Sequence, residues 1–207
     1  MIILLLFFTG LPAAFAQKKT VAQIKAELEK SPNSPLYVKE VLKKRFVIDT
    51  IVIRSTMQFI GLPDSLAYHG KVRKVYGPYH NGKTLVQVLA KAPATFNHPA
   101  QIFLDTAVFS KRFADSLSDN IMIRIKQGTA SFEDMARTYS MGGEGATRGD
   151  LGWIAVGYLL PQIEKELAHR KKGDIFKIWT ANGVHIIRKV EDAKEDHGYA
   201  LLMRVFL

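Results

Sequence analysis

The spacing of hydrophobic and polar positions near the start of the chain predicts two short helices followed by a strand. Over residues 20–30, apolar side chains recur at near-helical intervals among Lys and Glu, and the Pro-containing stretch 31–35 ends the run. A second helix is predicted over residues 36–45. Its predicted buried face consists of Tyr37, Val38, Val41 and Leu42. Residues 47–53 are almost all β-branched and predict a strand.

Two Asn-Gly dipeptides, at positions 81–82 and 182–183, predict two β-hairpins. Asn-Gly supplies the positive φ angles that tight hairpin turns require, and the dipeptides lie between strand-like runs within residues 70–93 and 173–193. The two segments resemble each other, so they predict an internal repeat. Residues 61–70, with a Gly at each end and a Pro between, are predicted to be a linking loop.

The middle of the chain predicts a strand over residues 100–104 and a long helix over 110–127. The predicted buried positions of this helix, four residues apart, are Phe113, Leu117, Ile121 and Ile125. Ser131 is a predicted N-cap for a second helix that ends near residue 139. A third short helix is predicted over residues 161–169.

A glycine-rich stretch, residues 140–161, follows neither helical nor strand periodicity. Its glycines are Gly142, Gly143, Gly145, Gly149, Gly152 and Gly157. Glycine permits positive φ angles and close approach of backbone segments. The stretch therefore predicts a built loop that shapes a surface between packed elements.

Composition limits the class of protein. Hydrophobic residues make up 47% of the 207 residues and charged residues 23%, the balance of a folded globular chain. The net charge is +10, but the basic residues lack interleaved aromatics, so a solvated surface or attraction to acidic clients is favoured, and no nucleic-acid partner is expected. Cysteine is absent and the histidines lack metal-ligand spacing, so no disulfide, metal or other cofactor is expected.

Both ends of the chain are apolar. Residues 1–16 predict a cleavable secretory signal peptide, with Ala14 and Ala16 in the small-residue positions before the cut. No other segment approaches the ~20 apolar residues of a membrane-spanning helix, so none is expected in the mature chain. Residues 193–207, apolar from Gly198 onward, form a C-terminal tail with two open alternatives: a strand packed on the chain's own core, or a strand or hydrophobic plug docked on another subunit.

A set of residues between positions 99 and 192 carries a family resemblance. They are Gly128, Phe132, Ala136, Tyr139-Ser140, Gly149-Asp-Leu-Gly-Trp153, Gly157, Pro161, Glu164, Lys172-Gly173 and Gly183-Val-His-Ile-Ile187. Together they resemble the parvulin-type (PpiC-like) peptidyl-prolyl cis-trans isomerase domain. The resemblance implies an α+β fold over 99–192, with a four-stranded antiparallel sheet and surrounding helices. Residues 17–98 resemble, more loosely, the chaperone portion of periplasmic foldases and imply a smaller α+β N-terminal module.

The resemblance also implies candidate site residues, three for a proline pocket and three for its polar floor. They are Leu151, Leu159 and Ile163, followed by Gln101, His185 and Gly142. His185 keeps one family histidine, whereas Gln101 stands where another is expected and Gly142 where the family has an acid or cysteine. The family's Ser/Thr-like position falls on Ala181 or Asn182. Rotation about an Xaa-Pro bond crosses a barrier of ~18–20 kcal/mol without an obligatory proton transfer, so shape and dipoles can do most of the work.

These assignments imply an exported, periplasmic isomerase or chaperone that acts on unfolded or proline-containing polypeptides during folding or export of envelope and secreted proteins. Because two of the polar positions depart from the family's pattern, the isomerase activity is expected to be weak or lost. An alternative stays open: a non-catalytic accessory subunit bound to an outer-membrane translocon or transporter, with the apolar tail in the interface.

Overall fold

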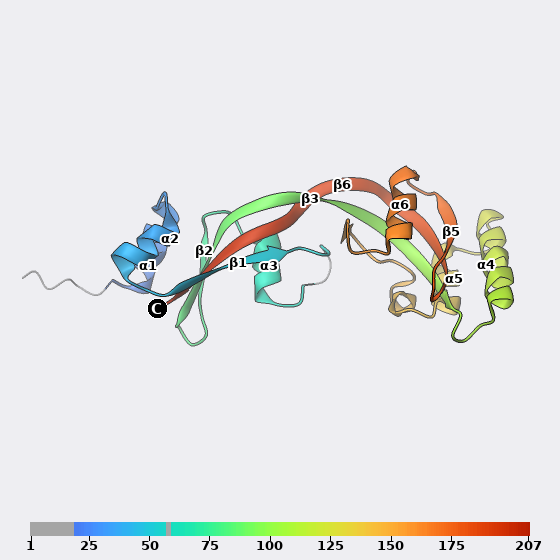
Figure 1. The fold of residues 1–207 in the computed structure, drawn as a ribbon, viewed down its shortest axis with the longest axis horizontal. Helices are drawn as coiled ribbons and strands as arrows, with labels where there is room; N and C mark the ends of the chain where they lie inside the picture. Colours follow the sequence, from blue (N-terminus) through green and yellow to red (C-terminus); the bar gives the residue numbers. More distant parts are fainter. Residues whose placement is uncertain (1–18, 57–58) are drawn as a thin grey trace, which may run out of the picture.

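Two long strands form the frame of the molecule. The computed structural model describes residues 19–56 and 59–207, so the predicted signal peptide lies outside the described residues. β3 (Thr84–Asp105) and β6 (Gly183–Phe206) pair antiparallel along their whole length. They form an arched ribbon that runs from one end of the elongated molecule to the other (Figure 1).

The ribbon carries a different pair of outer strands at each end. At one end β1 (Phe46–Val52) pairs with β6 and β2 (Val75–Tyr79) pairs with β3, which gives the order β1-β6-β3-β2. At the other end β4 (Ile154–Ala155) pairs with β3 and β5 (Ile175–Trp179) pairs with β6. The order there is β4-β3-β6-β5, so the predicted four-stranded antiparallel sheet is confirmed.

The two predicted hairpins begin the two long strands at opposite ends of the ribbon. The first turn, which holds Asn81 and Gly82, leads from β2 into β3, and the second, which holds Asn182, leads from β5 into β6. Asn81 and Gly82 have φ angles of 55° and 85°, as a tight hairpin turn requires. The similar sequence segments therefore occupy equivalent places in the two half-sheets.

The boundaries expected at 98/99 and 192/193 fall inside β3 and β6, so the two halves share their central strands. The pairing register of β3 with β6 shifts twice between Phe96 and Pro99. An extra residue in one strand bends it and increases its twist. These bulges mark the junction of the two halves within otherwise continuous strands.

Helices cover both faces of the first half-sheet. They are α1 (Val21–Lys30), α2 (Ser34–Tyr37), the single-turn π-helix η1 (Val38–Leu42) and α3 (Leu62–His69). The first three pack on the face that holds Leu85 and Met203, and α3 packs on the opposite face with Val86 and Leu202. Since successive strand residues point to opposite faces, the sheet is enclosed from both sides.

The prediction of a loop over residues 61–70 is wrong, because α3 occupies most of that segment. Pro63 lies in the first turn of α3, where its missing N–H leaves no hydrogen bond unmade, and Leu66 turns inward and is buried. The predicted burial of Val41 is also wrong. Val41 is exposed, whereas Val38 in the preceding turn is buried.

Helices also cover both faces of the second half-sheet. They are α4 (Lys111–Lys126), α5 (Phe132–Tyr139) and α6 (Pro161–His169), with the short 3-10 helix η2 (Gly143–Thr147) in the glycine-rich loop. α4 and α5 pack on Ile102 and Ile186, and α6 packs on Ile187. Phe113 was predicted to be buried but is exposed, because a strict spacing of four drifts around a helix of about 3.6 residues per turn, whereas the predicted burial of Ile121 is confirmed.

The C-terminal tail belongs to the chain's own core. Its residues pair with both β1 and β3 as the last part of β6. Leu202, Met203 and Val205 are buried there. Of the two alternatives for residues 193–207, packing on the chain's own core is therefore confirmed.

Candidate functional site

The candidate site lies on the face of the second half-sheet that α6 covers. Gln101 and Phe103 on β3 share this face with His185 and Ile187 on β6, because Gln101 pairs with Ile187 and Phe103 with His185. The Phe103 and His185 rings stack with their centroids 4.6 Å apart and their planes at 29°. The strand register thus brings the two predicted polar residues, Gln101 and His185, together.

A chain of hydrogen bonds extends from this pair to a carboxylate. His185 Nδ1 lies 3.0 Å from Gln101 Oε1, and Gln101 Nε2 donates to Glu144 Oε1 at 3.1 Å. The same carboxylate oxygen accepts a hydrogen bond from the Ser140 hydroxyl at 2.7 Å. The site therefore holds an acid, although its predicted position, Gly142, has no side chain.

Gln101 fixes the tautomer of His185. Its Nε2 donates to a carboxylate, which can only accept, so its Oε1 faces the imidazole and His185 Nδ1 carries the proton. His185 Nε2 is then an acceptor, and Thr180 Oγ1 lies 3.0 Å from it. Burial lowers the pKa of His185, which is only 6% exposed, below its ordinary value of 6.5, while Glu144 acts in the opposite direction. The imidazole is therefore neutral at pH 7.

Gly142 makes room for the carboxylate of Glu144. A Cβ added at position 142 would collide with the carboxylate atoms of Glu144. Gly142 has a φ of −91°, which any residue can adopt, so the need for glycine here is one of space. The acid lies two residues further along the loop than the resemblance implies, and the glycine permits this placement.

Backbone hydrogen bonds attach the glycine-rich loop to β3. The Phe103 N–H donates to Ser140 Oγ at 2.9 Å, and the Met141 N–H donates to the Phe103 carbonyl at 2.8 Å. Further along, the Gln101 N–H donates to the Gly149 carbonyl at 2.8 Å. Gly149 has a φ of 88°, and a Cβ there would lie 2.9 Å from the Gln101 carbonyl oxygen. Only glycine allows this approach.

The three predicted pocket residues fall into two groups. Leu159 and Ile163 lie in one apolar cluster with Ile187. Ile163 is only 2% exposed and acts as a packing residue, whereas Leu159 is half-buried. Leu151 lines a hollow of about 330 Å³ that Glu144 also lines. One group thus adjoins the strand of His185, and the other adjoins the carboxylate.

Three polar residues of the site are absent from the sequence-based prediction, namely Ser140, Glu144 and Thr180. Thr180, rather than Ala181 or Asn182, contacts His185. The hairpin signal could have found it, because a hairpin turn brings residues on its two arms together. No local signal points to Glu144, since the turn of η2 carries its side chain back to Gln101.

Residues 19–56 and 59–207 contain neither a metal cluster nor a membrane-spanning helix. No group of three or more His, Cys, Asp or Glu side chains in these ranges is arranged to hold a metal ion. No helix in the same ranges is long and apolar enough to cross a membrane.

The fold and site of the second half define its class. A four-stranded antiparallel sheet with surrounding helices, a glycine-rich loop and a buried histidine on the last strand are the features of a parvulin-type peptidyl-prolyl isomerase domain. Residues 102–191 match the family model described as Rotamase, PPIC-type PPIASE domain. This part of the chain belongs to that family.

Curated relatives match about half of the chain. Chaperone SurA of Chromobacterium violaceum is 35% identical over 106 residues, which cover 48% of this chain and 24% of the relative. Chaperone SurA of Bordetella avium is 33% identical over 104 residues, which cover 49% of this chain and 21% of the relative. The chain thus spans less than a quarter of the length of these relatives.

Solved structures match a similar share. A crystal structure of a PpiC-type peptidyl-prolyl cis-trans isomerase domain is 27% identical with a TM-score of 0.47, covering 50% of this chain and 95% of that one. PrsA from Bacillus subtilis is 28% identical with a TM-score of 0.39, covering 46% of this chain and 35% of that one.

Proposed function

We propose that the second half of the chain accelerates cis/trans isomerisation of Xaa-Pro bonds in polypeptides. The observation that carries this proposal is one continuous hydrogen-bonded chain on the face of the sheet. Its members, in order, are Thr180, His185, Gln101, Glu144 and Ser140. The half-buried side chain of Leu159 lies in the apolar cluster of Ile187, on the strand of His185, and that of Leu151 lines a hollow with Glu144.

Isomerisation of an Xaa-Pro bond is accelerated by fixed dipoles and needs no proton transfer. Amide resonance is lost when an Xaa-Pro bond twists, so groups that favour the twisted amide over the planar one lower the barrier. Gln101 and neutral His185 hold each other in one orientation, and the carboxylate of Glu144 is held by two donors. Such preorganised groups stabilise a changed charge distribution without reorganising.

Gln101 and Glu144 offset the departures from the family's pattern. The amide of Gln101 both accepts from His185 and donates to Glu144, as an orienting group must, but it cannot titrate or stack as an imidazole can. We therefore expect isomerase activity that is retained but weaker than that of a site with two histidines.

A double-mutant cycle tests this site. In a proline-peptide isomerisation assay, Gln101→Leu and Glu144→Gln should each lower kcat/KM by about tenfold or more, since both break one connected chain. The double variant should be no slower than the slower single variant. Exposed Glu195→Gln is the matched control and should leave the rate unchanged. Wild-type rates in both single variants would refute the site.

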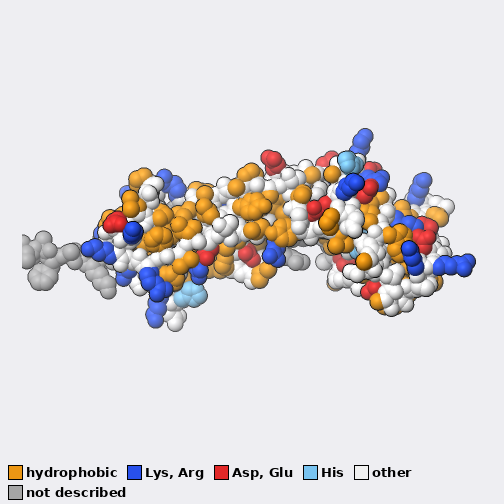
Figure 2. All heavy atoms as spheres, viewed as in Figure 1, with side chains coloured by type: hydrophobic (Ala, Val, Ile, Leu, Met, Phe, Trp, Pro, Cys, Tyr) orange, Lys and Arg blue, Asp and Glu red, His pale blue; other side chains and the backbone are white. Residues whose placement is uncertain are grey.

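A second candidate function is the holding of unfolded polypeptides. It draws on the relatives named Chaperone SurA and on the apolar surface of the first half. Figure 2 shows hydrophobic side chains gathered over that half and along the middle of the ribbon. Suppression of aggregation that persists in His185→Ala would support it. The apolar tail does not support the alternative of an accessory subunit, because the tail is part of β6 and pairs within the chain.

We also propose that the chain works in the periplasm during folding or export of envelope proteins, with residues 1–16 as its signal peptide, and that it associates there with an outer-membrane complex. Fractionation of cells that express the chain with and without residues 1–16 tests export. Periplasmic recovery that depends on this segment supports the proposal, and equal recovery without it contradicts the proposal.

A further inference from the structure

We propose that the open edge of β1 and the hollow beside it bind an extended polypeptide segment by β-strand addition. This surface lies in the first half of the molecule, apart from the half that carries Gln101 and His185 (Figure 1). The inference rests on the holding function proposed above, for which it names a surface and a mode of binding. It does not rest on isomerase activity.

The backbone of β1 has one side paired and one side open. The Phe206 N–H donates to the Arg45 carbonyl at 3.0 Å, and the Ile53 N–H donates to the Gly198 carbonyl at 2.8 Å. Alternate residues of an antiparallel strand face the same neighbour, so odd-numbered positions from 45 to 53 face β6. The residues whose N–H and C=O groups face outward are Phe46, Ile48, Thr50 and Val52. In the described part of the chain, β1 has no strand partner on that side.

The same edge already accepts a strand two residues further along. The Ala155 N–H donates to the Arg54 carbonyl at 2.8 Å, and the Thr56 N–H donates to the Trp153 carbonyl at 3.2 Å. Arg54 and Thr56 continue the even-numbered series that faces outward. The open stretch of β1 is therefore continuous with an edge that the chain itself uses for strand pairing.

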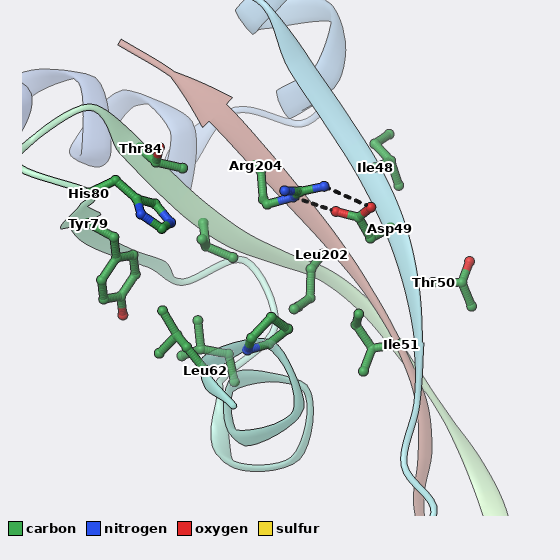
Figure 3. A pocket seen from close by; sticks show the side chains of 13 residues that line it. Ile48, Asp49, Thr50, Ile51, Leu62, Tyr79, His80, Thr84, Leu202 and Arg204 are labelled. Atoms are coloured by element: carbon green, nitrogen blue, oxygen red, sulfur yellow. Dashed lines mark hydrogen bonds and ion pairs between the residues drawn. The ribbon is translucent and has the colours of Figure 1, made fainter. Parts of the chain in front are cut away.

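An apolar hollow of about 730 Å³ lies beside the open edge, between β1, β6 and α3 (Figure 3). Its buried floor includes Leu66, Val86 and Leu202. Its rim includes Ile48 and Leu62, which are 43% and 41% exposed. The side chains of Arg204 and Asp49 bridge the strands at the hollow, and Arg204 Nε donates to Asp49 Oδ2 at 2.7 Å.

The edge and the hollow together define the ligand. A strand that pairs with residues 46–52 would run for roughly 20–25 Å at about 3.4 Å per residue. Its backbone would satisfy the outward N–H and C=O groups, and every second side chain would lie on the α3 face above the hollow. The surface therefore suits six to eight extended residues, as an order of magnitude, with apolar side chains at alternate positions.

Charge favours a polypeptide with acidic ends over a second copy of this chain. Lys43, Lys44 and Arg45 precede β1, and Arg54 follows it. Antiparallel pairing of two copies would bring the basic residues 43–45 of each copy to the end of β1 that Arg54 of the other copy flanks. Like charges directly opposite each other destabilise a strand pair. Acidic residues that flank an apolar segment would instead meet opposite charge.

Backbone methylation tests strand addition directly. The probe is a synthetic octapeptide without proline, with Val and Thr alternating between terminal Glu residues, titrated into the full chain by calorimetry. Two further versions of the peptide carry N-methyl groups, one on its odd-numbered and the other on its even-numbered backbone nitrogens. Each version loses the N–H donors of one edge and keeps its side chains. Binding should weaken by about tenfold or more for one of the two methylated peptides only. Equal binding of all three peptides would overturn the proposal.

Variants of the edge test the same surface from the protein side. Thr50→Pro removes an outward N–H without touching the pairing with β6, so it should weaken binding by about tenfold or more, whereas Thr50→Ala should not. Leu62→Lys at the rim should also weaken binding, and exposed Val108→Lys in the other half should not. Unchanged binding by Thr50→Pro would contradict strand addition.

Two readouts on the same samples separate a loss of peptide binding from misfolding and from a loss of isomerase activity. Tryptophan fluorescence and the proline-peptide rate report folding and the isomerase site, and both should be unchanged in Thr50→Pro. A slow wild-type rate would count against the isomerase proposal alone. Sedimentation tests the second copy: a wild-type dimer that Thr50→Pro dissolves would overturn the proposal by making another copy of this chain the occupant.

Discussion

Gly142 shows how a residue without a side chain can decide where a charge lies. The carboxylate of Glu144 occupies the space that a Cβ at position 142 would take, and from there it reaches Gln101 and Ser140. Glycine is therefore required at position 142 because Glu144 occupies the adjacent space, and not because glycine has a chemical role there. Replacing Gly142 moves the carboxylate of Glu144 without changing the net charge of the protein.

Gly142→Ala should therefore lower isomerase activity about as much as Glu144→Gln. The φ of −91° suits alanine and the carboxylate can swing away, so the free energy of unfolding should change by less than about 1 kcal/mol. Gly143→Ala is the matched control, because a Cβ there has open space around it. Activity assays with urea denaturation check both; a wild-type rate in Gly142→Ala would disprove the role given to Gly142.

His185 makes stability depend on pH. Burial holds its pKa below 6.5, so between its folded and unfolded pKa values the unfolded chain binds a proton that the folded chain does not. The stability that this group contributes is present above pH 6.5 and is lost as the pH falls through the lower folded pKa. Urea denaturation between pH 7.5 and about pH 5 should therefore show a smaller loss for His185→Gln than for the wild type. Identical curves for His185→Gln and the wild type would exclude this linkage.

At the scale of single elements, α6 depends on a buried lysine from β6. Lys189 is only 6% exposed, and its Nζ donates to the carbonyls of Leu167 at 3.1 Å and Arg170 at 2.7 Å. The last carbonyls of a helix have no partner within the helix. Lys189 therefore joins the end of α6 to the sheet that carries His185.

Lys189→Met should destabilise the protein by about 1–3 kcal/mol, because the Arg170 carbonyl loses its donor and the Leu167 carbonyl keeps only the 3.3 Å hydrogen bond from the Arg170 N–H. Lys165→Met, on the exposed face of α6, is the control and should change stability by less than about 0.5 kcal/mol. Denaturant titrations give both values. Equal stability of the two variants would mean that water replaces the ammonium group.

Local sequence signals predict some elements well and others poorly. Asn81-Gly82 and the turn before β6 were predictable, since hairpin turns depend on a few adjacent residues. α3 was not, because the glycines and Pro63 of its segment also suit a loop, and only packing of Leu66 on the sheet favours the helix. In the site, His185 follows from a motif, whereas Glu144 depends on a turn and a space that no sequence pattern records.

At the scale of the whole molecule, the shared strands should make the two halves unfold together. β3 and β6 each contribute to both half-sheets without a break. A substitution that weakens packing at one end should therefore lower the stability of the other end as well, because both ends share these strands. The junction near His98, where the register shifts, is the place at which this coupling could fail.

Leu202→Ala tests this coupling. Leu202 is buried in the first half, so the substitution should remove about 2–5 kcal/mol of stability. Trp179 packs on the core of the second half, whereas Trp153 packs on the apolar cluster that holds Leu202, so the test uses a Trp153→Phe background in which Trp179 alone reports unfolding of the second half. The fluorescence midpoint of Trp179 should fall together with the circular-dichroism midpoint. A fluorescence midpoint equal to that of the wild type would show that the halves unfold separately.

The central claim is that the second half still catalyses rotation about Xaa-Pro bonds through Gln101, Glu144 and His185. The most direct measurement is exchange NMR of a proline peptide, which reads cis/trans interconversion without a coupling protease. With micromolar protein, the exchange rate should rise above the uncatalysed rate for the wild type and Gly143→Ala and fall back toward it for Gly142→Ala. An uncatalysed rate with the wild-type protein would contradict this claim.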